Sequence, residues 1–386
     1  MTQHFDPTRR RLLGGMTVAL VAGAVPGAVR AEQGITGGEI RIGMVNALSG
    51  PASALGSNLK AGAEAMFSRV NSLGGVHGRK IVLVSLDDGY EPERAAAATR
   101  RMIEQENVFA LFGYVGTPTS AAAVPLASRA NVPYLFPFTG AEFLRNPVNK
   151  WVFNVRASYF DETETMVERL TRDANARRIA IFIQDDAFGE AGKAGVNRAL
   201  HKRDMKIAAE ARYKRNTMEI DEGLAILKAA TPDAVVFIGT YKPFAALVKK
   251  ARAAGIGAKF MTVSFIGTAE FIKEAGAAGE GVYITQVMPS PDNAGTPLVK
   301  RFREDMRGGP VNYSSIEGYA GAAVLVEALR RTGADPTRQK LLGALQGLNT
   351  DLGGLPIAFS TASHQGAKVV FLTVVKDGRA VETDRL

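Results

Sequence analysis

Short, almost wholly apolar runs alternate with amphipathic stretches along the chain from Glu39 onward. In the first half these runs begin at residues 40, 80, 108 and 133, and in the second half at residues 179, 207, 234, 259 and 281. Each interval leaves room for one strand and one covering helix. Because the runs are apolar throughout rather than alternating, they indicate parallel strands buried on both faces. The sequence therefore predicts an α/β fold with two doubly wound parallel-sheet lobes.

The order of the elements predicts how the chain is divided between the lobes. The extended run 150–156 has no helix before it and is interpreted as a crossover to the second lobe. Helical patterns are expected at residues 298–306, 315–332 and 337–348, followed by strands at 355–359 and 368–375, with Asp377-Gly378 as turn chemistry. We assign residues 39–155 and 286–352 to an N-terminal lobe and residues 156–285 and 353–386 to a C-terminal lobe.

The first 31 residues have the pattern of an export signal. Arginines at 9, 10 and 11 precede Leu12-Leu13 and an uncharged apolar stretch of about 16 residues, which is short for a membrane span of about 20. Two arginines before a leucine pair match the twin-arginine type, although the same arginines also suit an ordinary basic n-region. We expect cleavage near Ala31, a periplasmic location and no membrane span in the mature protein.

The composition and net charge of the chain exclude several kinds of site. The chain has no cysteine, which excludes disulfides, thiolate metal sites and cysteine nucleophiles. Its four histidines are far apart and form no His-Glu-x-x-His motif, so we expect neither a metal site nor a cofactor. The 47 Lys and Arg residues against 38 Asp and Glu give a net charge of +9. These charges form no basic stripe interleaved with aromatics, which argues against nucleic-acid binding.

Ligands of an open α/β sheet bind beyond the carboxyl ends of the strands, where helix N-termini present free N–H groups. The segments at those ends are rich in hydroxyls, glycines and aromatic rings: residues 46–51, 113–120, 136–142, 184–189, 239–243 and 264–268. Such groups hold a small polar molecule, including a carboxylate, but they are poor at breaking bonds. The chain contains no nucleophile elbow, dinucleotide fingerprint or P-loop.

Two weaker signals point to an enzyme. Ser57 and Lys60 match the Ser-x-x-Lys of acyl-transferring enzymes, although Ser57 could equally cap a helix. A periplasmic serine hydrolase that uses this pair is the alternative function. The aspartate pairs 87–88 and 185–186 could share a proton or bind Mg²⁺, but acidic loops after strands are more often solvated or cap the next helix. Thr117 before Pro118 is a common helix start, and a capping hydroxyl there is also a carboxylate site.

Over residues 39–386 several short stretches have the residues, order and spacing of one protein family. They are 48–51 with Gly56, 71–79, 87–88, 137–144, 185–190 and 250–255. With them the chain resembles the leucine/isoleucine/valine-binding proteins, the periplasmic solute receptors of branched-chain amino-acid ABC importers. The resemblance implies the type I periplasmic-binding fold, with crossovers near 154–158, near 285–288 and between 349 and 355. It also implies a monomeric receptor that closes on a small-molecule solute and docks on an inner-membrane ABC permease.

The same resemblance implies a ligand site. In the family, the solute's carboxylate is held by a hydroxyl at the start of the third helix and by the loop after the fourth strand. The matching positions here are Thr117 and the loop Phe138, Thr139, Gly140 and Ala141. Phe188 and Tyr241 match aromatic positions of the second lobe, with tyrosine usual at the former. Leu55 stands where a first-lobe tyrosine often lies over the ligand.

Ser264 stands where amino-acid binders of this family carry a glutamate that pairs with the ligand's ammonium group. A buried ammonium without a carboxylate partner is costly. Either another acid, such as Glu142, Asp186 or Glu190, reaches the site, or the solute is a small carboxylate or amide without the amine. The rings expected near the cleft make aromatic acids candidates: Phe138, Phe188, Tyr241 and Phe265. A receptor that senses a solute without transporting it is a further alternative.

Overall fold

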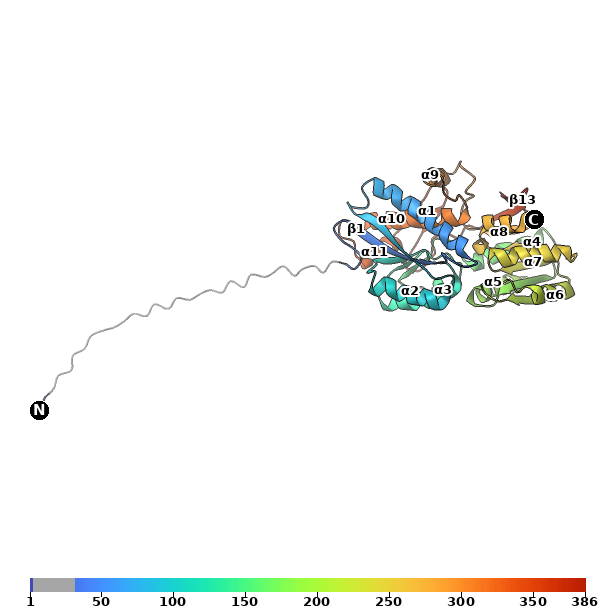
Figure 1. Ribbon diagram of the computed structural model, residues 1–386, viewed down its shortest axis with the longest axis horizontal. Coiled ribbons are helices and arrows are strands. Elements are labelled where there is room, and N and C mark those ends of the chain that lie inside the picture. Colours follow the sequence, from blue (N-terminus) through green and yellow to red (C-terminus); the bar gives the residue numbers. More distant parts are fainter. Residues whose placement is uncertain (3–31) are drawn as a thin grey trace. The chain divides into compact units, whose positions relative to one another are not determined.

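Two sheets of mainly parallel strands form the frame of the chain (Figure 1). The computed structural model describes residues 1–2 and 32–386, so the expected export signal and its arginines lie outside the described residues. None of the helices within 32–386 is both long enough and apolar enough to cross a membrane. The two sheets follow each other along the sequence, as expected for a two-lobed α/β fold.

The first sheet has five parallel strands in the order β2-β1-β3-β4-β5. They are β1 (Glu39–Asn46), β2 (Lys80–Asp87), β3 (Ala110–Phe112), β4 (Tyr134–Leu135) and β5 (Val152–Phe153). The fifth strand lies within the run 150–156 that was interpreted as a crossover. Val152 and Phe153 pair in parallel with Tyr134 and Leu135, because both are apolar and the sheet edge offers them burial. The passage to the second lobe therefore begins after Phe153.

Helices cover both faces of this sheet (Figure 1). They are α1 (Ser53–Ser72), α2 (Pro92–Glu104), α3 (Thr117–Arg129), α9 (Pro297–Asp305), α10 (Tyr313–Arg331) and α11 (Arg338–Gln346). In β1, Ile42 and Met44 join the core cluster that contains α1 and α10, whereas Val45 joins the cluster that contains α2 and α3. The strand thus buries alternate side chains on opposite faces, as a doubly wound sheet requires.

Helices α1 and α10 pack with their backbones in close contact. A Cβ added to Gly62 of α1 would overlap the backbone oxygen of Ser315, and one added to Gly318 of α10 would overlap the backbone oxygen of Leu59. Two glycines therefore set the distance between the two helices that cover one face of the first sheet.

The second sheet has seven strands in the order β14-β13-β10-β9-β8-β6-β7. They are β6 (Ile179–Gln184), β7 (Glu210–Tyr213), β8 (Ala234–Ile238), β9 (Lys259–Thr262), β10 (Tyr283–Gln286), β13 (Phe371–Lys376) and β14 (Arg379–Glu382). Strands β6 to β10 are parallel, and β13 runs antiparallel to β10. Asp377 and Gly378 both have positive φ and form the predicted turn between β13 and β14. The strand expected from residue 207 begins at Glu210 instead.

The helices of the second lobe are α4 (Tyr159–Arg172), α5 (Ala187–His201), α6 (Asp221–Ala230), α7 (Tyr241–Ala253) and α8 (Thr268–Ala275). Within residues 32–386 there are also three short 3-10 helices: η1 (Glu142–Leu144), η2 (Ser264–Ile266) and η3 (Gly276–Gly279). Helix α4 packs against α5, and α7 packs against α8. Helix α4 begins with a capping box formed by Ser158 and Asp161, which fixes the point where the chain enters this lobe.

The packing of residues 349–371 bears on where the chain makes its last passage between the lobes. Strands β11 (Asn349–Asp351) and β12 (Pro356–Ala358) form a separate antiparallel pair. The third crossover was predicted between residues 349 and 355, but Ile357 and Phe359 are buried in the cluster that contains α1 and α10. The chain joins the second sheet only at Phe371. We therefore propose that the N-terminal lobe keeps the chain up to about Ala367.

The two aspartates at the end of β2, Asp87 within the strand and Asp88 directly after it, lie in opposite environments. Although burial opposes ionisation, hydrogen bonds from Ser49, Gly89 and Leu48 lower the pKa of Asp87 to about 2. Burial raises the pKa of Asp88 to about 7, and Asp88 Oδ2 has no hydrogen-bond partner. Asp87 thus holds the loop that contains Ser49, a structural role different from the helix cap or solvated acid that was expected.

Replacing Gly62 by alanine should lower the free energy of unfolding by about 1–3 kcal/mol, because the new methyl group forces α1 and α10 apart. Urea denaturation measures the change. The matched control is Gly343→Ala in α11, where an added Cβ meets no atom within 4 Å. The free energy of unfolding of that variant should rise by about 0.5–1 kcal/mol, because alanine favours a helix more than glycine does. Equal effects at the two sites would contradict the packing argument.

Asp88→Asn should make stability less dependent on pH. The pKa of Asp88 is higher in the folded protein than in the unfolded chain, so its contribution to stability is full below about pH 4 and is lost as pH rises to about 7. When the pH is raised from 4.5 to 8, the free energy of unfolding of the variant should rise relative to that of the wild type by on the order of a few kcal/mol. Urea denaturation at the two pH values measures this change.

Asp87→Asn is the control for that experiment. The pKa of Asp87 is lowered on folding, so its contribution is present above about pH 4 and is lost only as pH falls towards 2. The Asp87→Asn variant should therefore lower the free energy of unfolding by a similar amount at pH 4.5 and pH 8. If the free energies of unfolding of Asp88→Asn and the wild type differ by the same amount at both pH values, the raised pKa of Asp88 is refuted.

Candidate functional site

The strand ends of the first lobe meet the helix starts of the second lobe in one buried cluster. All nine residues predicted for the site are buried: Leu55, Thr117, Phe138, Thr139, Gly140, Ala141, Phe188, Tyr241 and Ser264. The apolar members come from both lobes and belong to one continuous hydrophobic cluster. We call this set, with the neighbours described below, the interlobe site.

A chain of hydroxyl groups lies at the start of α3. Thr117 was considered as the cap of this helix, but the cap is Gly116, and Thr117 makes no capping hydrogen bond. Its Oγ1 instead lies 2.7 Å from Thr139 Oγ1, which in turn donates to the Tyr159 hydroxyl at 3.3 Å. Gly140 permits this approach, because a Cβ there would lie 2.6 Å from the backbone nitrogen of Tyr159. Neutral hydroxyls thus connect the first lobe with the first residue of α4.

The loop that carries Thr139 is held by a buried guanidinium group. Arg145 donates to the backbone oxygens of Ala141 at 2.9 Å, of Thr139 at 3.4 Å and of Arg156 at 3.2 Å. Burial lowers the pKa of Arg145 to about 10. Nothing in the sequence distinguishes this arginine from a surface residue, so sequence reasoning missed its role in positioning the loop.

Aromatic rings from both lobes surround Phe265 of η2. Its ring centroid lies 5.4 Å from that of Phe138, 4.6 Å from that of Phe188 and 6.1 Å from that of Tyr90. Three of these rings were expected in the cleft, whereas Tyr90 was not. Tyr90 follows β2 with a positive φ, and its hydroxyl accepts a hydrogen bond from Gln184 at 3.3 Å. Because Tyr90 and Gln184 lie in different lobes, this bond also joins the lobes.

Leu55 and Tyr241 lie together, beside Gly267. A Cβ added to Gly267 would lie 2.6 Å from Leu55 Cδ2 and 3.5 Å from Tyr241 Cδ1. The leucine at the usual tyrosine position therefore contacts the second lobe. Tyr241 is the first residue of α7, so its ring stands at a helix start, as predicted.

The acid that faces Ser264 is Glu162 of α4. Ser264 donates to it twice, from the backbone N–H to Oε2 at 2.7 Å and from Oγ to Oε1 at 3.0 Å. Thr285 Oγ1 donates to Oε2 at 2.6 Å. Glu162 is fully buried, and the sequence gave no sign of it, because an acid in the first turn of a helix usually favours the helix dipole at the surface.

Two of the three acids considered as substitutes for the missing glutamate, Asp186 and Glu190, are paired with arginines. Asp186 caps α5 through the Phe188 N–H at 2.8 Å and pairs with Arg215 at 3.3 Å. Glu190 is half exposed and pairs with Arg212 at 2.6 Å. Glu142 lies half-buried in η1, where burial raises its pKa.

Arg156 places a cation in the middle of this arrangement. It lies between β5 and α4 with 1% of its surface exposed, 3.3 Å from Glu162 and 3.4 Å from Glu317 of α10. Its guanidinium carbon lies 5.0 Å from the centre of the Phe138 ring. Although burial alone would lower the pKa of Arg156, the two carboxylates raise it. Burial raises the pKa of Glu317 to about 7.

Polar contacts at the rim also join the lobes. Arg215 pairs with Glu91 at 2.8 Å, and Asn216 Nδ2 donates to the same carboxylate at 2.6 Å. On the other side, Asn58 Nδ2 donates to Glu270 at 2.6 Å. Since Glu91 and Asn58 belong to the first lobe and their partners to the second, the structure has the lobes in contact around the interlobe site.

The residues considered for catalysis do not form a catalytic arrangement. Ser57 is exposed in the interior of α1, which is capped at Ala52, so it is not the cap proposed for it. Lys60 pairs with Glu64 at 3.6 Å. Within the described residues, no group of three or more His, Asp and Glu side chains could hold a metal ion.

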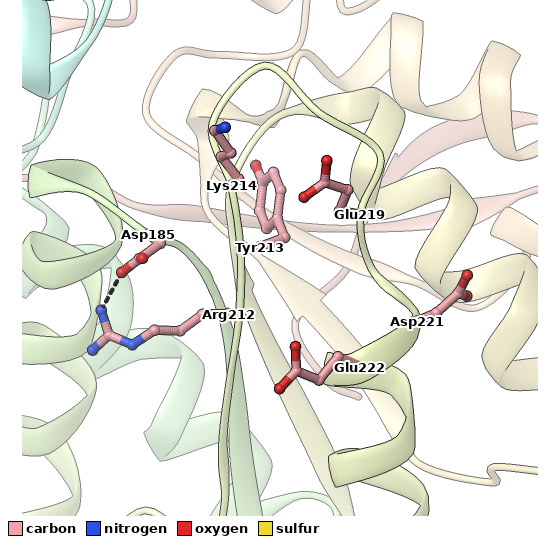
Figure 2. Close-up of a pocket in the computed structure, with 7 residues that line it drawn as sticks. All are labelled: Asp185, Arg212, Tyr213, Lys214, Glu219, Asp221 and Glu222. Atoms are coloured by element: carbon pink, nitrogen blue, oxygen red, sulfur yellow. Dashed lines mark hydrogen bonds and ion pairs between the residues drawn. The ribbon is translucent and has the colours of Figure 1, made fainter.

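A separate pocket of about 410 Å³ lies at the end of β7 and the start of α6 (Figure 2). Its lining is formed by Asp185, Arg212, Tyr213, Lys214, Glu219, Asp221 and Glu222. Arg212 pairs with Asp185 at 2.8 Å, as the dashed line in Figure 2 shows, and also with Glu190 and Glu210. None of the predicted site residues lines this pocket, so it is distinct from the interlobe site.

The same architecture occurs in known proteins. Residues 39–380 match the family described as periplasmic binding protein. The leucine-specific-binding protein of Salmonella typhimurium is 24% identical over 335 residues, covering 82% of this chain and 89% of that protein. The crystal structure of a possible leucine/isoleucine/valine-binding protein from Rhodopirellula baltica has 32% identity and a TM-score of 0.85, covering 90% of this chain and 96% of that chain.

A second solved structure agrees with the first. The substrate-binding periplasmic protein from Ralstonia solanacearum has 31% identity and a TM-score of 0.85, and the match covers 89% of this chain and 100% of that chain. The two-lobed parallel sheets and these similarities lead to one conclusion. The chain belongs to the periplasmic binding protein family, with the type I fold of its leucine/isoleucine/valine-binding members.

Proposed function

We propose that the protein is the solute receptor of a branched-chain amino-acid-type ABC importer and captures a small carboxylate-bearing solute at the interlobe site. The candidates are hydrophobic amino acids, aromatic or aliphatic acids, and amides. The observation that carries the proposal is the buried hydroxyl chain of Thr117 and Thr139 at the start of α3, beside rings of both lobes. The names of the relatives, which include a leucine-specific-binding protein, support the same class of solute.

The ligand's carboxylate would lie at the helix start, where the free N–H groups of α3 and the neutral hydroxyls can donate to it. The rings of Phe138, Phe188 and Phe265 would pack against its apolar body. Binding would favour the closed form, because only that form brings the contacts of both lobes to one molecule. The closed receptor would then dock on an inner-membrane permease after export and cleavage near Ala31.

The serine hydrolase alternative has less support, because Ser57 is exposed within a helix and Lys60 is paired with Glu64. A thermal-shift screen of amino acids, aromatic acids and amides tests the receptor directly. A receptor should show a saturable rise in melting temperature and return the ligand unchanged. Turnover of a compound, or labelling of Ser57 by an active-site serine probe, would favour the hydrolase.

Thr117→Ala should weaken solute binding by about 1.5–3 kcal/mol, because it removes a hydrogen bond to a charged group. Calorimetry with the best ligand of the screen measures this loss. Thr117→Ser retains the hydroxyl and is the matched control, which should stay close to the wild type. If alanine and serine bind equally well, Thr117 does not contact the solute.

Arg215→Ala and Glu91→Ala should each weaken solute binding modestly, since both remove a contact made across the lobes. The double variant should lose less than the sum of the two, with a coupling of roughly 0.5–1 kcal/mol by calorimetry. Arg331→Ala is the control, because Arg331 pairs with Glu327 within α10. Strict additivity would show that the Arg215–Glu91 pair does not contribute to closure.

A further inference from the structure

The charges of the interlobe site define the solute more narrowly than its hydroxyls and rings do. Arg156 is 1% exposed, and its Nε and Nη1 atoms have no hydrogen-bond partner. Only Nη2 is hydrogen-bonded, to Glu162 at 3.3 Å and to Ser264 Oγ. Buried donors without partners are costly, and an acceptor supplied by a ligand would relieve that cost.

The two carboxylates beside Arg156 are poor partners for a ligand cation. Each oxygen of Glu162 already accepts two hydrogen bonds, Oε1 from Ser264 Oγ and Arg156, and Oε2 from the Ser264 N–H and Thr285. Glu317 is paired with Arg156 at 3.4 Å. A ligand ammonium group would therefore have to share both carboxylates with the Arg156 guanidinium cation, which repels it.

We propose that the solute is a carboxylate without an ammonium group, with an aromatic or branched apolar body, and that Arg156 is the residue that selects it. This inference rests on the proposed function and makes it more specific. Arg156 fills, with the protein's own cation, the place beside Glu162 that an amino group of the solute would otherwise need. Its Nε has no hydrogen-bond partner and its Nη1 has only the ion pair with Glu317 at 3.4 Å, so both can donate to an anion, as can the hydroxyls of Thr117 and Thr139.

Matched ligand pairs test the proposal on the wild-type protein by calorimetry. The pairs are 3-phenylpropanoate with L-phenylalanine, and 4-methylpentanoate with L-leucine, with 3-phenylpropanamide as the neutral analogue. We expect each acid to bind at least 10-fold more tightly than its amino acid, and 3-phenylpropanoate at least 10-fold more tightly than the amide. An amino acid or amide that binds as tightly as the acid overturns the proposal while leaving the receptor function intact.

Two variants test whether Arg156 causes the preference for an acid. Arg156→Gln should weaken acid binding 10-fold or more and weaken amide binding by a clearly smaller factor, whereas equal losses for acid and amide would argue against a charge role. Because Arg156→Gln could impair folding by leaving Glu162 without its cation, Glu317→Gln provides an independent test. It retains Arg156 and should change the affinities for the acid and for its amino acid by the same factor.

Glu317→Gln would give the opposite result if Glu317 pairs with a ligand ammonium group. Amino-acid binding would then fall 10-fold or more while acid binding stays the same, and the proposal would be wrong. If no acid, amino acid or amide raises the melting temperature of the wild type, the proposed function itself fails. The two failures are thus distinguishable.

Discussion

The buried ion pairs of Arg156 with Glu162 and Glu317 are the interaction on which the interlobe site depends. Arg156 lies in the segment that connects the lobes, Glu162 in α4 of the second lobe and Glu317 in α10 of the first. A buried charge is tolerable only with partners, and removal of one partner of such a pair typically destabilises a protein by about 3–5 kcal/mol. The network therefore constrains the position of three elements at once, and the rings and hydroxyls are arranged around it.

Around this charged centre the site uses neutral groups. Thr117, Thr139 and Tyr159 form a chain of hydroxyls, and Phe138, Phe188 and Phe265 supply apolar surface. In the proposed receptor, such a site would recognise a small solute by a few directed hydrogen bonds and by shape, which suits reversible capture. The rim pairs across the lobes are more exposed, so each contributes little to stability and they can open and close at low cost. A rigid buried ion-pair network with weak contacts at the rim would suit a receptor whose lobes close on a solute.

Positions in the site that no motif marks have large effects on its geometry. Arg145 holds the Thr139 loop through four backbone oxygens, and Gly140 and Gly267 let the two lobes approach. Tyr90 reaches the ring cluster from a residue with positive φ. These residues contribute by position rather than by chemistry, which is why the types of side chain in the sequence do not reveal them.

The sequence by itself determined the two parallel sheets, most of their strands and helices, the turn at Asp377-Gly378 and the segments at the strand ends. These features depend on hydrophobic periodicity and turn chemistry, which act over a few neighbouring residues. Only the tertiary structure decided that β5 extends the first sheet, that Ile357 and Phe359 pack in the cluster of α1 and α10, and that Glu162 faces Ser264. Arg156 and Glu162 lie 108 and 102 residues from Ser264 in the sequence, and no local pattern encodes a contact between residues so far apart.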